Sequence, residues 1–155
     1  MAEAPRIRPG QAADLKAMAD LEKRAAINPW SLSQFLESSL RDRDAALVAE
    51  SGDAGLVGFA VYQRVLDEAS LLNIAVEPAQ QGRGLGAVLL QHLLDRLAQQ
   101  GVSRLLLEVR CGNLPAIRLY RRLGFVDDGR RPDYYPVPGG REDALLMSRE
   151  LERKL

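Results

Sequence analysis

A strand, a helix and a second strand follow one another in the second half of the chain, and this pattern most restricts how the chain can fold. Ala69–Val76 predicts a strand, Leu85–Gln100 an amphipathic helix that ends at Gly101, and Arg104–Arg110 a further strand. The unbroken run Leu105–Leu107 is typical of a strand that is covered on both faces. Two neighbouring strands joined by a helix lie parallel, so this region predicts a βαβ unit. The buried stripe of the helix is expected to consist of leucines, namely Leu85, Leu89, Leu90, Leu93, Leu94 and Leu97.

The remaining segments predict a mixed sheet in a single α/β domain over residues 1–155. Two runs joined by a glycine-containing turn are typical of an antiparallel hairpin in the N-terminal half. A segment rich in proline and glycine, Asp127–Asp143, is expected to form a loop. The sheet is therefore expected to be antiparallel early and parallel late. Further strands are expected at Arg6–Pro9, Ala45–Glu50, Leu56–Arg64 and Ala144–Ser148, and further helices at Ala12–Ala26, after the N-cap Ser31, and at Leu114–Leu123.

Composition excludes several classes of protein. The 155 residues are the length of one domain, and 21 basic residues balance 21 acidic ones, which argues against a broad nucleic-acid-binding surface. No apolar run approaches the roughly 18 residues needed to span a bilayer, and the N terminus lacks the apolar segment of a secretory leader. One cysteine, Cys111, and one histidine, His92, allow neither an internal disulfide nor a histidine-rich metal site. We expect a cytoplasmic protein without metal, and its oligomeric state stays open.

A glycine-rich loop, Gln81–Gly86, joins the predicted strand to the long helix. Glycines let the backbone approach a ligand, and the free N–H groups of a helix N terminus attract an anion such as a diphosphate. Arg83 would add positive charge. Ala87 follows Gly86 and stands where a P-loop needs lysine and where a dinucleotide fingerprint has its third glycine, so both of those motifs are excluded. Two interpretations remain: an anion site, or a helix start whose glycines permit tight packing.

The Gln-x-x-Gly-x-Gly loop between a strand and a long helix resembles the acetyl-CoA motif of the Gcn5-related N-acetyltransferases. The order of predicted elements also resembles their fold, from about Ile7 to Met147. One departure is Cys111-Gly112-Asn113, where the family more often has alanine or proline, then serine, then asparagine. Further segments look most like bacterial ribosomal-protein-alanine N-acetyltransferases: Asn28–Ser31, Leu66–Ala69, Leu72–Val76, Leu107–Arg110, Ala116–Tyr120, Leu123–Phe125, Tyr134–Pro136 and Gly140–Ala144.

The resemblance implies a cofactor-binding site, two catalytic residues and an acceptor. Glu108 would be the general base and Tyr120 the general acid, while Asn113 would touch acetyl-CoA near its reactive end. The acceptor would be the N-terminal alanine of the eighteenth small-subunit ribosomal protein. Alternative acceptors are a lysine side chain or a small-molecule amine, and a non-catalytic CoA sensor is a further alternative that the presence of both catalytic residues disfavours. The pantetheine arm would pair with the backbone of Ile74, Ala75 and Val76, and the pyrophosphate would lie on Gly82, Arg83, Gly84, Leu85, Gly86 and Ala87.

The positions and acidities of Glu108 and Tyr120 bear on their proposed roles independently of the resemblance. Glu108 follows three leucines at the carboxyl end of a strand, so we expect it to be buried in the site; alternatively it is a solvated partner of Arg104 or Arg110. Tyr120 lies two helical turns after Asn113 and shares its face, although a packing role is the commoner one for an aromatic residue there. A phenol of pKa about 10 can protonate a thiolate whose conjugate acid has a pKa of about 8.5. An α-amine, of pKa about 7.7–8.0, needs less help from a base than lysine, at about 10.4.

Aromatic and acidic segments outside this set predict a peptide groove. Trp30 and Tyr134–Pro136 could line it, or they could be packing residues. Asp67-Glu68 and Glu142-Asp143 could bind a cationic peptide end, or they could be solvated surface pairs. His92 and Cys111 are expected to have no role in the chemistry.

Overall fold

The computed structural model describes residues 4–152, so both ends of the predicted domain 1–155 lie outside the described residues. The strands are β1 (Arg6–Pro9), β2 (Asp44–Ser51), β3 (Gly55–Val65), β4 (Glu68–Val76), β5 (Arg104–Arg110), β6 (Val126–Val137) and β7 (Gly140–Glu150). The helices are α1 (Leu15–Ala25), α2 (Leu32–Ser39), α3 (Leu85–Gln99) and α4 (Leu114–Arg122), with 3-10 turns at Ala12–Asp14 and Pro78–Gln80. Within residues 4–152, none of the helices has the length and apolar character required to cross a membrane.

The strands form one mixed sheet in the order β1-β2-β3-β4-β5-β7-β6. The predicted α/β class and the βαβ unit are confirmed, because β4 and β5 pair in parallel and α3 connects them. This parallel pairing is short: it runs from Glu68 opposite Arg104 to Ser70 opposite Leu106. Beyond Ser70, β4 and β5 separate, and this separation creates the space for a site.

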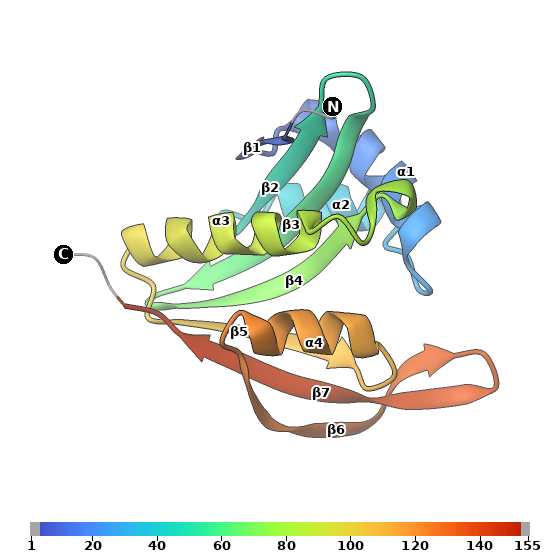
Figure 1. Ribbon diagram of the computed structural model, residues 1–155, viewed down its shortest axis with the longest axis vertical. Coiled ribbons are helices and arrows are strands. Elements are labelled where there is room, and N and C mark those ends of the chain that lie inside the picture. Colours follow the sequence, from blue (N-terminus) through green and yellow to red (C-terminus); the bar gives the residue numbers. More distant parts are fainter. Residues whose placement is uncertain (1–3, 153–155) are drawn as a thin grey trace.

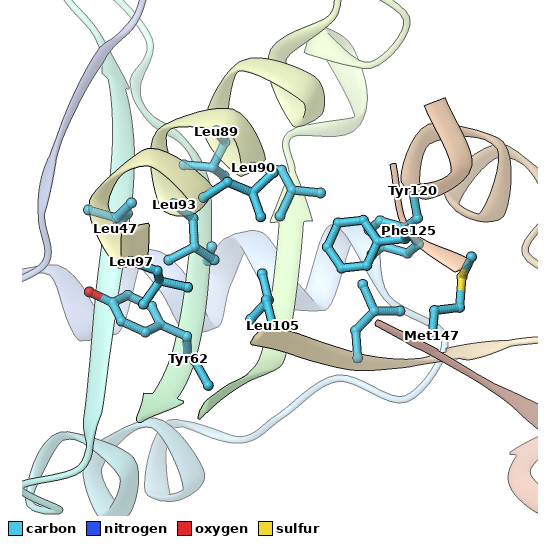
Figure 2. Close-up of a cluster of buried hydrophobic side chains, with 14 of the residues drawn as sticks. Leu47, Tyr62, Leu89, Leu90, Leu93, Leu97, Leu105, Tyr120, Phe125 and Met147 are labelled. Atoms are coloured by element: carbon cyan, nitrogen blue, oxygen red, sulfur yellow. The ribbon is translucent and has the colours of Figure 1, made fainter. Parts of the chain in front are cut away.

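Helices cover both faces of the sheet. In Figure 1, α3 and α4 lie in front of the strands, and α2 is seen behind them. The predicted leucine stripe of α3 is buried, and Figure 2 shows Leu89, Leu93 and Leu97 pointing towards the strands. Tyr120 and Phe125 lie at the other end of the same core, beside Met147 of β7. A second core on the opposite face unites α1 and α2 with β2–β4 through residues that include Met18, Leu21, Phe35, Val48 and Phe59.

Local capping explains where two helices begin. The Ser31 side chain accepts a hydrogen bond from the Gln34 N–H (3.2 Å), and the Ser31 N–H donates to the Gln34 side chain (2.8 Å). This is the predicted capping box, and it starts α2. Asn113 caps α4 by accepting from the Ala116 N–H (3.3 Å), with Pro115 in the first turn.

The prediction of a loop over Asp127–Asp143 is wrong, because this segment forms most of a β6–β7 hairpin. β6 is the outer strand of the sheet, where a proline costs no ladder hydrogen bond. Pro132 lies in an irregularity of the β6–β7 register between Arg131 and Tyr135, which separates it from the regular ladder. Proline and glycine content therefore predicted a loop where the sequence forms an irregular edge strand.

The prediction that β5 is covered on both faces is also wrong. Leu105, Leu107 and Val109 are buried against the α3–α4 face, whereas Leu106 and Glu108 on the other face are only half-buried. Successive side chains in a strand point to opposite faces, so a run of leucines does not by itself require two covered faces. The partly open face of β5 leaves room for polar side chains.

Candidate functional site

A cleft of about 720 Å³ opens where β4 and β5 separate. Ile74, Ala75 and Val76 of β4 line it, and their other edge is paired with β3. Beyond Ser70 no described strand pairs with the β5-facing edge of β4, so its backbone groups there can bind an extended ligand. The remaining lining comes from the end of α1 and the residues after it, from the glycine loop and α3, from Arg110 of β5, from α4 and its N-cap, and from β6.

The glycine loop borders the cleft with its backbone. Gly82 and Gly84 have φ of +80° and +78°, a conformation that side-chain-bearing residues rarely adopt. An added Cβ at either glycine would meet no atom within 4 Å, so the backbone conformation, and not crowding by the protein, requires glycine. The first helical hydrogen bond runs from the Val88 N–H to the Gly84 carbonyl (3.0 Å), which leaves the N–H groups of residues 85–87 without a helical acceptor. The start of α3 thus provides an anion site beside the cleft.

The other loop residues and Asn113 take different positions relative to the cleft. Leu85, Gly86, Ala87 and Asn113 all line it. The Arg83 side chain is not among the lining groups, and its guanidinium donates to the Gln80 side chain (3.2 Å). The contact of Arg83 with a ligand therefore stays a prediction.

Tyr120 reaches the cleft from the core side. It is 5% exposed, lines the cleft, and packs against Phe125 at 5.7 Å between ring centroids. Burial, and to a smaller extent the neighbouring Tyr135, raise the pKa of Tyr120 above its ordinary value. The phenol therefore remains protonated and able to donate, but it is a weaker acid than the ordinary tyrosine assumed from the sequence.

Glu108 lies on the partly open face of β5 and is not among the residues that line the cleft. The prediction that it is buried beside the leucines is wrong: its side chain is 31% exposed because the strand alternation puts it on the partly open face with Leu106, away from the buried Leu105 and Leu107. Its partner is neither Arg104 nor Arg110 but Arg131 of β6, at 3.0 Å. No sequence pattern indicated this pair, since it depends on the β6–β7 hairpin.

Tyr135 is a cleft residue that lies near enough to Glu108 to respond to its charge. It lines the cleft from β6, and burial raises its pKa to about 12, with a further contribution from the charge of Glu108. Tyr134 is more exposed and lies edge-on to Tyr135, with 5.0 Å between the ring centroids. The Arg131 guanidinium lies over the Tyr134 ring. Of the aromatic residues suggested for a peptide groove, Tyr135 is the one that lines the cleft.

The other groove candidates occupy different places. Trp30 packs against Phe35, with 5.2 Å between the ring centroids, and it does not line the cleft. Asp67 and Glu68 lie at the amino end of β4, whereas the cleft opens at its carboxyl end. Glu142 pairs with Arg110 (3.1 Å) and also accepts from the Gly112 N–H (3.3 Å), and Asp143 accepts from the Asp133 N–H (3.0 Å).

Glu22 of α1 is a cleft residue that the sequence analysis missed. It is 2% exposed, accepts hydrogen bonds from Asn73 of β4 and from the Trp30 N–H (3.2 Å), and lines the cleft with Asn73. A sequence pattern could have revealed it, because Glu22 occupies the buried stripe of α1 that Met18 begins one turn earlier. A carboxylate at a core position of an amphipathic helix is a candidate functional group.

Comparison with known proteins gives consistent matches. The model of the acetyltransferase (GNAT) family matches residues 15–125. The chain is 44% identical over 135 residues to a [ribosomal protein bS18]-alanine N-acetyltransferase of Escherichia coli (strain K12), covering 87% of this chain and 90% of that protein. It is 46% identical over 136 residues to the Salmonella typhimurium protein of the same name, with 87% and 90% covered. The crystal structure of the ribosomal-protein-S18-alanine N-acetyltransferase from Escherichia coli superposes with a TM-score of 0.91 at 40% identity, covering 97% of this chain and 96% of that one.

Proposed function

The chain belongs to the acetyltransferase (GNAT) family, and we propose that it transfers the acetyl group of acetyl-CoA to the N-terminal alanine of ribosomal protein bS18. The observation that carries the proposal is the cleft itself, which combines a free strand edge, a helix-start anion site and a buried phenol. The names of relatives at 44% and 46% identity support the choice of acceptor. We further expect a single domain over residues 1–155 that acts in the cytoplasm without direct contact with nucleic acid or a membrane.

The residues that line the cleft fit acetyl-CoA. Gly82 and Gly84 give an open backbone at the anion site, which suits a pyrophosphate, and the edge at Ile74–Val76 offers N–H and C=O groups to the amides of a pantetheine arm. The bound molecule supplies an acetyl thioester, which reacts with an amine. The chain would therefore hold the donor largely through its backbone.

Glu108 and Tyr120 would move the two protons of the transfer. Tyr120 lines the cleft and stays protonated, so it would donate to the departing thiolate, while Glu108, which does not line the cleft, would accept the amine proton through one water. The ion pair with Arg131 holds Glu108 in the free protein, and an incoming ammonium group would compete with Arg131 for the carboxylate. An α-amine of pKa about 7.7–8.0 loses its proton readily enough for a partly solvated carboxylate to suffice.

Product mapping tests the proposal. The purified protein is incubated with acetyl-CoA and a peptide that has the N-terminal sequence of bS18 followed by a lysine, and the product is sequenced by mass spectrometry. We expect one acetyl group on the α-amine of alanine, and none when the same peptide carries a blocked N terminus. Acetyl transfer to the lysine alone, or no transfer to either amine, would overturn the proposed acceptor.

A further inference from the structure

Glu22 has one carboxylate oxygen with two hydrogen bonds and one with none. Oε2 accepts from the Trp30 N–H (3.2 Å) and from the Asn73 amide. Oε1 is buried, and within residues 4–152 it has no hydrogen-bond partner. Buried polar atoms in folded proteins are generally paired, so an unpaired carboxylate oxygen needs an explanation.

The position of Glu22 relates this oxygen to the cleft. Glu22 and Asn73 both line the cleft, and Asn73 directly precedes the strand edge Ile74–Val76 that we assign to acetyl-CoA. The residues that follow α1, Ala26–Asn28, line the same space. Glu22 therefore lies where the α1–α2 segment meets β4, on the other side of the cleft from α4.

The energetic cost of Glu22 argues against a purely structural role. Burying a carboxylate costs stability unless its oxygens are satisfied, and an apolar residue at such a core position is often at least as stable. Its raised pKa, caused mainly by burial and opposed by the two hydrogen bonds, reflects the same cost. The free protein thus keeps an acceptor oxygen that no described group satisfies, on a residue that lines the cleft, and a ligand N–H or O–H group could pair with it.

We propose that Glu22 is an acceptor-recognition residue: Oε2 holds the α1–α2 segment against β4, and Oε1 accepts a hydrogen bond from the α-amino group of the acceptor peptide. The inference rests on the proposed function, in which an amine is the substrate group that brings donors into the cleft. An α-ammonium carries only donors, so a charge-assisted bond to a carboxylate suits it. Glu22 would thus bind the amine in the ground state, whereas Glu108 would take its proton.

The variant Glu22→Gln separates the two oxygens. Glutamine retains one oxygen for Trp30 and Asn73, but it places an NH₂ group, which cannot accept a hydrogen bond, at the position of Oε1. We expect the KM for the alanine peptide to rise about 10-fold to 100-fold, the range of a charge-assisted hydrogen bond. We expect kcat to stay within about threefold, the KM for acetyl-CoA within about twofold, and the Tm not to fall.

A des-amino peptide tests the nature of the contact. In this probe a propionyl group replaces the first alanine, so only the amine is missing, and its binding to the CoA-saturated protein is measured by calorimetry. We expect equal affinity for wild type and Glu22→Gln, because the contact with Oε1 does not exist for this probe. If Glu22→Gln weakened the binding of the amine and des-amino peptides equally, the proposal would be overturned. Glu22 would then only shape the surface of the cleft.

Two further variants complete the test. Asp14→Asn is the matched control, since Asp14 is another buried acid close in sequence that pairs with Arg8 (2.8 Å) and does not line the cleft. We expect it to lower stability and to leave both KM values unchanged. If Glu22→Gln does not fold, Glu22→Asp replaces it, and we again expect a raised peptide KM because the shorter side chain withdraws the oxygen. An unchanged peptide KM in the folded variant overturns the inference, whereas a wild-type protein that acetylates no α-amine overturns the proposed function instead.

Discussion

The two sides of the gap between β4 and β5 are built by different means. On the side that we assign to acetyl-CoA, the cleft is made of backbone: a strand edge at Ile74–Val76, two glycines of positive φ and the start of α3. On the side that we assign to the acceptor, it depends on side chains from distant segments. Glu22 bonds to Asn73 across 51 residues, and the Asn28 amide donates to the Pro136 carbonyl (2.6 Å) across 108.

This difference separates a general function from a specific one. A backbone site binds acetyl-CoA whatever the acceptor is. It tolerates many side chains, provided that glycine is kept where φ is positive. A side-chain site changes with single substitutions, so it can distinguish one acceptor from another. We therefore expect mutations on the two sides to have different kinetic effects.

The largest effect is expected for Glu108→Gln on the acceptor side. The turnover rate should fall by roughly 10²–10⁴, the usual contribution of general base catalysis, while acetyl-CoA affinity stays close to wild type. The defect should shrink at high pH, where more of the amine is already free. Initial rates measured across a range of pH test this expectation. Glu68→Gln is the control, because Glu68 is a strand-end carboxylate that pairs with Arg104 (3.7 Å) away from the cleft. A defect of equal size at every pH would assign Glu108 a positioning role only.

Tyr120→Phe should have the next largest effect. Phenylalanine keeps the ring against Phe125, so stability should change little, while the loss of the hydroxyl should lower the rate by about 10². An acyl donor with a more acidic thiol should lose less, because its leaving group needs less protonation. Equal losses with both donors would contradict the acid role and leave Tyr120 as a packing residue.

Gly84→Val should damage the acetyl-CoA side alone. Its φ of +78° strains a side-chain-bearing residue by about 1–2 kcal/mol, and the displaced backbone should weaken acetyl-CoA binding about 10-fold to 100-fold in calorimetry. Gly139→Val is the matched control: its φ is +86°, and it lies in the β6–β7 turn and not in the cleft. This control should lose similar stability but no acetyl-CoA affinity. Unchanged affinity in a folded Gly84→Val protein would refute the anion site.

The smallest effects are expected in stability, where two buried acids should respond to pH in opposite directions. The guanidinium of Arg8 lowers the pKa of Asp14, so its stabilising contribution is present above the unfolded pKa and is lost as the pH falls. Burial raises the pKa of Glu22, so its ionisation costs stability as the pH rises above the unfolded value. Relative to wild type, Glu22→Gln should therefore gain Tm as the pH rises from 4 to 8, whereas the Tm deficit of Asp14→Asn should be full above about pH 4 and shrink as the pH falls below it, by about 2–4 °C per kcal/mol. Parallel shifts in the two variants would contradict these assignments.

The sequence predicted the backbone side of the gap much better than the side-chain side. The leucine stripe of α3, the Ser31 capping box and the glycine loop are local patterns, and each gives rise to the expected element. The β6–β7 hairpin was missed because an edge strand tolerates proline and irregular register. The partner of Glu108 was missed with it, since Arg131 reaches that carboxylate only through the hairpin. Glu22 could have been found from its place on the apolar face of α1, but its unpaired oxygen depends on the tertiary structure.

The gap between β4 and β5 should thus hold two sites that can be damaged independently. The direct test measures both KM values and kcat/KM for Gly84→Val, Glu22→Gln and the double variant, each with the other substrate saturating. We expect Gly84→Val to raise only the KM for acetyl-CoA and Glu22→Gln to raise only the KM for the peptide. The losses in kcat/KM should multiply in the double variant, as they do for uncoupled positions. A single variant that raises both KM values, or a double variant no worse than either single one, would contradict the independence of the two sites.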